Sequence, residues 1–185
     1  MTREEALRLV RQNVKNENSV KHMLATEAIM RAVARRFDEN EEKWGLAGLL
    51  HDLDMEIVDY KQNPEKQGVV GAEMLAKMGV DSVITEAIKA HNEATGKKRE
   101  TLIERAIFCI DPLTGLIVAA TLVLPSKKLA DLNPQSVLNR FKEKSFAKGA
   151  SRQIIASCSE ISLSLEEFVE IGLKAMQNIS SDLNL

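Results

Sequence analysis

Apolar residues recur along this chain at intervals of three and four, the spacing of one face of an α-helix. Short polar segments separate these runs, and no stretch alternates long enough between apolar and polar residues to predict a β-strand. The pattern predicts an all-α protein of about eight to ten helices. We expect them at residues 4–14, 16–37, 41–52, 68–78, 82–91, 101–110, 113–124, 133–144, 151–158 and 165–179.

Two connections affect the later argument. We expect Asp111-Pro112 to interrupt the apolar stretch 101–124, because Asp before Pro suits an N-cap followed by the first residue of a helix. Residues 54–67 contain Pro64 and mixed polarity, which predicts a loop. In that loop we expect the Asp54 carboxylate to be exposed to water.

Composition narrows the class of protein. With 185 residues, 44% hydrophobic and 28% charged, a single domain over residues 1–185 is expected. The net charge of -2 provides no broad basic field, so we expect no nucleic-acid polymer as partner. The apolar stretch 113–124 is shorter than the roughly 20 residues that span a bilayer, so we expect no membrane partner. Cys109 and Cys158 belong to no paired motif, which favours a reduced, cytoplasmic location.

The segment Gly48-Leu49-Leu50-His51-Asp52-Leu53-Asp54 carries the strongest chemical signal. An ionised carboxylate among leucines costs several kcal/mol unless it is compensated, and a metal ion would compensate it. A helix that ends here with its polar side chains in water is the alternative. The chain contains three histidines, His22, His51 and His91, each beside apolar residues. Imidazoles together with carboxylates form a common ligand mixture for divalent metals.

The order of these residues resembles the HD superfamily of metal-dependent phosphohydrolases. A histidine on an early helix, His22, precedes the pair His51-Asp52 by about thirty residues, and Asp111 follows on an apolar helix. Residues 71–75 and 87–92 resemble the intervening part of many HD domains, and residues 141–149 resemble a small subgroup of predicted HD hydrolases. The resemblance implies an HD-domain helical bundle over about residues 19–124, with additional C-terminal helices over about 125–185.

The resemblance also implies the site and its activity. His22, His51, Asp52 and Asp111 would hold one divalent metal ion, and Mn, Fe, Zn, Co and Ni are not distinguished. Asp52 would orient the attacking water or accept its proton. The expected substrate is a small phosphorylated molecule such as a nucleotide, which the protein would cleave as a phosphoester hydrolase.

One departure from the family concerns a second metal. Many binuclear HD domains have a histidine where this chain has Gln67, and an amide is a much poorer ligand, so a second ion is doubtful. His91 would then contact substrate phosphate or act as general acid, although a weak second ion remains open. Lys21 and Lys89 lie close in sequence to site histidines and are candidates for substrate binding.

Other interpretations stay open at this stage. A few HD-fold enzymes are di-iron oxygenases, and a non-catalytic module that binds a nucleotide or a metal is a third possibility. Basic residues also recur every four positions, and on one continuous helix they would form either a solvated face or a rim that attracts phosphate. They are Arg140, Lys144, Lys148 and Arg152. The sequence does not predict the oligomeric state.

Overall fold

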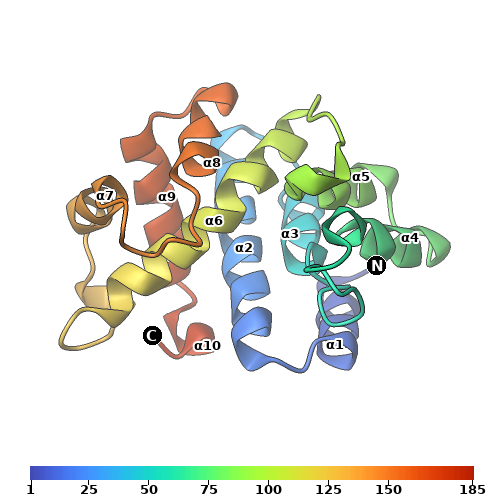
Figure 1. Ribbon diagram of the computed structural model, residues 1–185, viewed down its shortest axis with the longest axis horizontal. Helices are drawn as coiled ribbons and strands as arrows, with labels where there is room; N and C mark the ends of the chain where they lie inside the picture. The colour runs from blue at the N-terminus through green and yellow to red at the C-terminus, as the bar shows by residue number, and fades with distance from the viewer.

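The computed structural model describes all 185 residues and contains ten α-helices, four short 3₁₀ helices and no β-strand (Figure 1). The all-α prediction is therefore confirmed. The helices are α1 (Arg3–Asn13), α2 (Glu17–Arg36), α3 (Glu41–Leu50), α4 (Val69–Lys77), α5 (Ser82–His91), α6 (Leu102–Leu122), α7 (Pro134–Lys142), α8 (Arg152–Ala156), α9 (Leu165–Gln177) and α10 (Ser180–Leu183). The 3₁₀ helices are Pro64–Lys66, Glu93–Thr95, Leu129–Asp131 and Ser157–Ile161.

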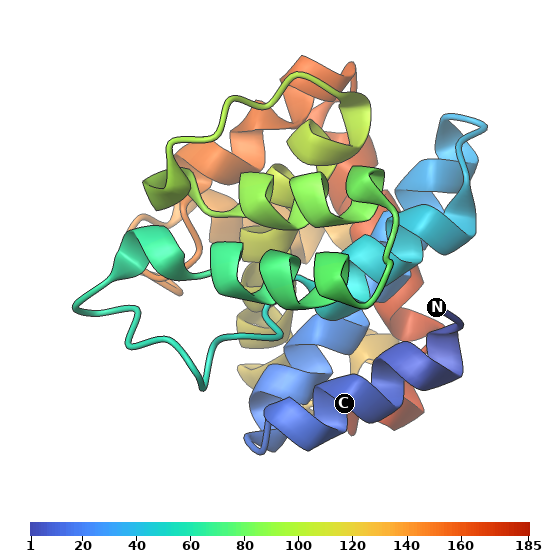
Figure 2. The ribbon, with the colours of Figure 1, turned by 90° about the vertical axis from the view of Figure 1, so that its right-hand side faces the viewer.

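Helices α2 and α6 form the centre of the bundle. Helix α2 packs against α3, α6 and α9, while α6 also packs against α5, α7 and α8. Figure 1 shows α1, α3, α4 and α5 on one side of this pair and α7, α8 and α9 on the other. Figure 2 shows α4 beside α5, with the segment before α4 projecting beyond them. The C-terminal helices thus extend a helical core, as expected, while the boundary near residue 125 stays a prediction.

Most helices begin at a residue whose side chain pairs with the first free backbone N–H groups, as the sequence signals require. The Asn16 side chain accepts from Asn18 N at 2.9 Å at the start of α2. Asn40 does the same for α3, and Asn133 precedes the proline that opens α7. These local signals explain why the expected and observed helix starts agree within a few residues.

Helix α6 corrects one expectation, because it runs without a break through Pro112. Asp111 is therefore an internal helical residue and not an N-cap. A proline inside a helix removes one backbone hydrogen bond. Its neighbours on both sides are nevertheless buried, including Ile107, Ile110 and Leu113. The packing of this apolar face holds the two halves of the helix in line.

Helix α6 also corrects the length argument about membranes. Its 21 residues make it long and apolar enough to cross a bilayer, but 61% of its apolar window is buried inside the protein. The core helix of a globular protein meets the same criteria of length and composition. The interpretation of this segment as a buried helix therefore holds, although the reason given from its length does not.

Gly48 allows α3 to approach the backbone of α2 closely. A Cβ atom at this position would lie 2.9 Å from both Cα and N of Glu27. That separation is closer than real Cβ contacts, and the atoms it meets belong to the backbone of α2. A residue with a side chain would push the helices apart, so glycine sets the spacing between His22 on α2 and His51 after α3.

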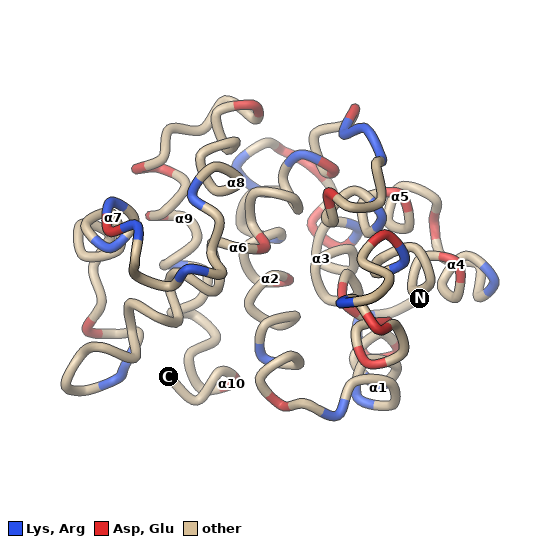
Figure 3. Tube along the Cα trace, in the orientation of Figure 1, with Lys and Arg blue, Asp and Glu red and all other residues tan.

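The four basic residues form no helical stripe, because α7 ends at Lys142 and no continuous helix connects Arg140 to Arg152. Lys144 and Lys148 lie in the connecting loop. The Arg152 side chain turns back to this loop and donates to six backbone carbonyl groups. Figure 3 shows basic and acidic residues interspersed along the chain, without one basic face in this view.

Candidate metal centre

Five side chains from four helical segments meet at one point. His22 lies in the first third of α2, His51 caps α3, Asp52 follows it, His91 ends α5 and Asp111 lies within α6. His22 Nε2 lies 3.1 Å from His51 Nε2 and 2.9 Å from Asp111 Oδ1. Asp52 Oδ2 lies 3.4 Å from His51 Nε2, and Asp52 Oδ1 lies 3.5 Å from His91 Nε2. The structure therefore brings together all four predicted metal ligands and His91.

Backbone carbonyl groups orient two of the imidazoles. His51 Nδ1 lies 2.8 Å from the carbonyl oxygen of Gly48, and His91 Nδ1 contacts the carbonyl oxygen of Ile88. Because a carbonyl only accepts, each Nδ1 carries the proton and donates it. Both rings therefore direct Nε2 to the centre, the orientation typical of histidines that bind metal.

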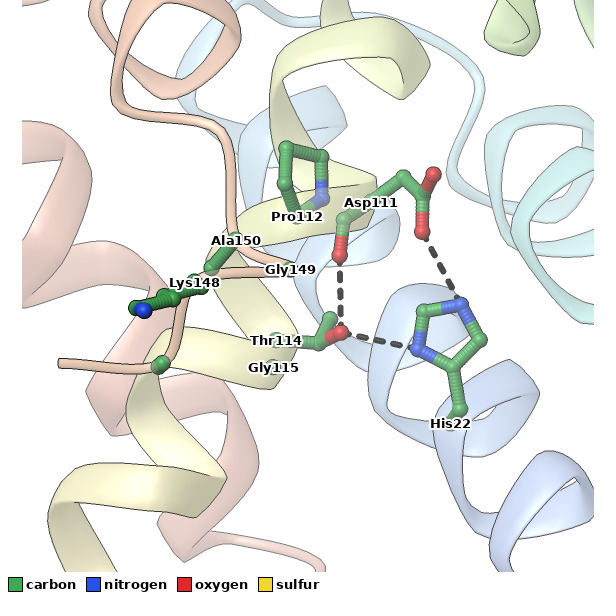
Figure 4. Close-up of a pocket in the computed structure, with 9 residues that line it drawn as sticks. His22, Asp111, Pro112, Thr114, Gly115, Lys148, Gly149 and Ala150 are labelled. Atoms are coloured by element: carbon green, nitrogen blue, oxygen red, sulfur yellow. Dashed lines mark hydrogen bonds and ion pairs between the residues drawn. The ribbon is translucent and has the colours of Figure 1, made fainter. Parts of the chain in front are cut away.

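The third imidazole is oriented by a hydroxyl group that the sequence did not single out. His22 Nδ1 lies 2.8 Å from Thr114 Oγ1, and the Thr114 hydroxyl donates to the carbonyl oxygen of Asp111 at 2.8 Å. The hydroxyl can then accept from His22 Nδ1–H, which directs His22 Nε2 to the Asp111 carboxylate (Figure 4). The only sequence signal for Thr114 is its position three residues after Asp111, close to one helical turn.

The centre is strongly polar, and His51, Asp52 and His91 are buried while His22 and Asp111 are partly exposed. Burial lowers the pKa of His91, but hydrogen bonding and attraction to Asp52 outweigh it and raise that pKa to about 9. Burial lowers the pKa of His51 below its usual value. Burial opposes ionisation of Asp52, yet the nearby His51 and His91 lower the pKa of its carboxyl group. Ionised carboxylates thus persist in a buried site where imidazoles surround them.

These residues fit a divalent cation. The donor atoms of His22, His51 and Asp52 lie within 4.8 Å of one another, as do those of His51, His91 and Asp111. Three Nε2 atoms face the centre together with the buried Asp52 carboxylate and the partly exposed Asp111 carboxylate. No Lys or Arg neutralises these carboxylates, since the recorded ion pairs of Asp52 and Asp111 are with the three histidines. Mixed imidazole and carboxylate ligands suit several divalent metals, so the donor set does not choose among them. The catalytic, metal and substrate roles of individual residues stay predictions.

Asp54 is not exposed to water, which corrects our expectation. Its side chain is fully buried and accepts from the N–H groups of Gly68 at 2.9 Å and Gly71 at 2.7 Å. These groups belong to the first turn of α4, where free N–H groups favour a negative charge. Asp54 thus holds α4 beside the centre. The only sequence signal for this contact was the pair of glycines at positions 68 and 71. In the structure, a Cβ at Gly71 would lie 3.3 Å from Asp54 Cγ.

Gln67 lies between Asp52 and His91. Its amide Nε2 donates to Asp52 Oδ1 and lies 3.1 Å from His91 Nε2. Asn92 Nδ2 donates to the backbone carbonyl oxygen of Gln67 at 2.9 Å and thereby helps to position it. The sequence singled out Gln67 as a departure from the family, and the structure places its side chain at the centre.

The candidate substrate lysines differ in position. Lys21 lines a cavity that also includes His22. Lys89 Nζ pairs with Glu86 at 2.8 Å, and Lys89 does not line the cavities that contain His22. The role of both lysines in substrate binding stays a prediction, and the geometry favours Lys21.

Comparison with known proteins gives a consistent result. The family model described as HD domain matches residues 20–114, which include every residue of the centre. A Ribonuclease Y of Geobacter sulfurreducens is 28% identical over 171 residues, which cover 91% of this chain and 32% of that protein. A Ribonuclease Y of Lawsonia intracellularis is 28% identical over 143 residues, which cover 75% of this chain and 26% of that protein. The chain thus spans between a quarter and a third of the length of these relatives, and no solved structure matches it significantly.

The relatives correct one prediction. We expected a small phosphorylated substrate and no nucleic-acid polymer, and the relatives are named as ribonucleases. The expectation of no nucleic-acid polymer was wrong because it rested on the net charge of -2, which averages over the whole surface. A hydrolase needs favourable charge only along the path of its substrate.

Membership of the family rests on both kinds of observation. The HD model covers more than half of the chain, and the histidines and aspartates that suggested the resemblance meet at one centre in the structure. The predicted helical fold and the predicted class of hydrolase agree with this match. The chain therefore belongs to the HD superfamily of metal-dependent phosphohydrolases.

Proposed function

We propose that this chain is a metal-dependent phosphodiesterase that hydrolyses RNA. One observation carries the chemistry: three imidazole Nε2 atoms and two carboxylates converge where a cavity of about 360 Å³ meets the protein surface. The similarity to proteins named Ribonuclease Y over 91% of the chain supports RNA as the substrate class. In the reaction, a water oxygen bonds to phosphorus, one P–O ester bond breaks, and the products are a phosphomonoester and an alcohol.

Each residue of the centre has a distinct task in this proposal. His22, His51, Asp52 and Asp111 would hold the ion. When bound, a divalent ion would polarise a phosphoryl oxygen and make water a better nucleophile. Asp52 would orient the attacking water and accept its proton. His91, whose Nδ1 is held by the Ile88 carbonyl group, gives a proton to the leaving oxygen from Nε2 or binds the phosphate there.

We further propose that the centre holds one ion and not two. The Gln67 amide occupies the space between Asp52 Oδ1 and His91 Nε2, which are atoms that a second ion would need. Carboxamides are weak ligands for divalent metals compared with imidazole. Elemental analysis of the purified protein should give about one ion per chain, and two tightly bound ions would contradict this part of the proposal.

The test uses a labelled single-stranded RNA and separate additions of Mn, Co, Ni, Zn, Fe and Mg. The wild-type protein should cleave the RNA with at least one of these metals. The Asp52→Ala variant should lose both metal retention and cleavage, because Asp52 contacts all three histidines. Glu73→Ala, an exposed position on α4, is the matched control and should remain active.

Three outcomes would contradict the proposal. A metal-loaded and active Asp52→Ala variant would exclude the assigned role of Asp52. A metal-loaded wild-type protein without cleavage of RNA would exclude the substrate and would favour the non-catalytic module. Consumption of oxygen by an iron-loaded protein would indicate the oxygenase instead. The cytoplasmic location expected from the two isolated cysteines stays a prediction.

A further inference from the structure

Two cavities meet beside the candidate metal centre. One has a volume of about 360 Å³ and includes Lys148 among its lining residues. The other has a volume of about 490 Å³ and includes Lys21. Both are lined by His22, Thr114 and Gly115, so they adjoin along the same turn of α6. A ligand that extends beyond one phosphate would therefore have space in two adjoining cavities beside the centre.

The Lys21 cavity has the character of a site for a flat, partly apolar group. Val118 and Leu122 of α6 form one wall, and Leu183 and Leu185 of the C-terminal segment contribute apolar surface to it. A few polar groups stand among them. They are Asn18, Lys21 and Asn184. Ligand sites of about 300–1,000 Å³ commonly combine mostly apolar walls with a small number of polar groups, and a nucleobase matches that description.

The Lys148 cavity has a different character. Its outer wall is the loop 147–150, which passes over α6 (Figure 4). Lys148 is exposed and forms no ion pair with a carboxylate. Figure 4 shows its side chain directed away from His22 and Asp111, so its ammonium group suits a phosphate next to the reacting one and not the reacting phosphate itself.

Arg152 holds this loop in place. Its guanidinium donates to the carbonyl oxygen of Ala147 at 3.1 Å and to that of Ala150 at 2.6 Å, on both sides of Lys148. A further bond, to the carbonyl oxygen of Phe146, is 2.6 Å long. A single side chain thus fixes the backbone that presents Lys148, which makes Arg152 a positioning residue.

We propose that the two cavities form one groove for an RNA strand that crosses the metal centre. The scissile phosphodiester lies at His22 and Asp111, a neighbouring nucleoside fills the Lys21 cavity, and Lys148 contacts the next phosphate on the opposite side. This inference rests on the proposed function and adds the path of the substrate to it. The two lysines supply the local positive charge that the net charge of the chain conceals.

Gly115 provides the sharpest test, because it lies where the cavities join. A Cβ atom at this position would meet no other atom within 4 Å. The first atom of a side chain can therefore be placed there without a clash, and a larger side chain would extend from it at the junction of the two cavities. Gly115→Leu should block the strand, whereas Gly115→Ala adds only a methyl group and serves as the matched control.

The experiment measures binding and cleavage separately. Binding is followed by fluorescence anisotropy with a 2′-O-methyl hexanucleotide, which reports on the groove whether or not cleavage occurs. Cleavage is compared for an RNA hexanucleotide and for bis(p-nitrophenyl) phosphate, a single diester without a nucleoside. Gly115→Leu should weaken hexanucleotide binding at least tenfold and should lower kcat/KM for the hexanucleotide more than for the small diester. Lys77→Ala, on the exposed side of α4, should change neither value.

The role of Lys148 is tested through the salt dependence of hexanucleotide binding. Each phosphate contact contributes about 0.7 to the slope of log K against log salt for a single strand. Lys148→Ala should therefore reduce that slope by about 0.7, which a purely structural role would not do. Arg152→Met should produce the same change in slope. Lys148→Arg keeps the positive charge and should therefore retain the slope of the wild-type protein.

The outcomes separate the groove from the proposed function. If the wild-type protein cleaves both substrates but Gly115→Leu binds the hexanucleotide as tightly as wild type, the groove is wrong and the proposed function stands. If the wild-type protein binds the hexanucleotide, loses it with Gly115→Leu and cleaves neither substrate, the proposed function is wrong and the groove stands. Failure of the wild-type protein to bind the hexanucleotide overturns the groove.

Discussion

The contact between Gly48 and α2 makes a quantitative prediction about stability. In Gly48→Ala, the new methyl group would lie 2.9 Å from Cα and N of Glu27 and 2.9 Å from the carbonyl oxygen of Thr26. All three are backbone atoms, so no side chain can move aside to relieve the contact. Overpacking of this kind costs about 1–3 kcal/mol. Replacement of a helical glycine by alanine stabilises the helix by about 1 kcal/mol, because alanine has the higher helix propensity.

Gly115→Ala isolates the overpacking cost, because both substitutions gain helix propensity and only Gly48 meets a backbone. Gly115 has open space around its Cβ direction, so its alanine variant should be more stable by about 0.5–1 kcal/mol. The free energies of unfolding of the two alanine variants should differ by about 1–3 kcal/mol. For a chain of this size, 1 kcal/mol shifts Tm by about 2–4 °C, so Gly48→Ala should melt roughly 2–12 °C below Gly115→Ala.

The same contact should affect the metal centre. His51 Nδ1 donates to the carbonyl oxygen of Gly48, so a displacement of α3 moves the His51 ring relative to His22. Loss of such an outer contact commonly weakens metal affinity by about 10–100-fold. Calorimetric unfolding and metal titration measure the two effects. Equal Tm shifts in the two alanine variants, together with wild-type metal affinity in Gly48→Ala, would refute the reasoning.

Three further predictions follow from other contacts. Asp54→Ala should destabilise the protein by roughly 2–5 kcal/mol in urea unfolding, because the buried N–H groups of Gly68 and Gly71 lose their acceptor, whereas Asp54→Asn should cost less. Burial alone would raise the pKa of Glu104, but hydrogen bonds from backbone N–H groups and from Lys97 Nζ outweigh burial, so the pKa lies below its usual 4.5. The stabilisation by Glu104 is therefore present above about pH 4.5 and is lost as the pH falls through the folded pKa. Glu104→Gln should therefore be less stable at pH 7 by about 1–2 kcal/mol, and urea midpoints should show this gap closing as the pH falls through the folded pKa of Glu104. Saturation with a divalent metal at 100 times Kd should add about 2.7 kcal/mol to stability, with a rise in Tm that chelation reverses and that Asp111→Ala abolishes; an unchanged Tm would count against the centre.

The sequence by itself determined the helices and the candidate ligands. Helical spacing of apolar residues, asparagine caps and Pro134 act within a few positions, so they fix helix starts before any tertiary contact forms. The ordered set His22, His51-Asp52 and Asp111 likewise indicated the HD centre, because imidazole and carboxylate types carry their chemistry wherever they are placed.

Only the tertiary structure decided how distant segments meet. Asp54 is buried because the start of α4 lies against it, and α6 continues through Pro112 because apolar neighbours pack on both sides of that proline. The Gln67 amide reaches Asp52 and His91 only once residues 15 and 24 positions away are brought beside it. Such contacts depend on the packing of whole helices, which no local spacing in the sequence records.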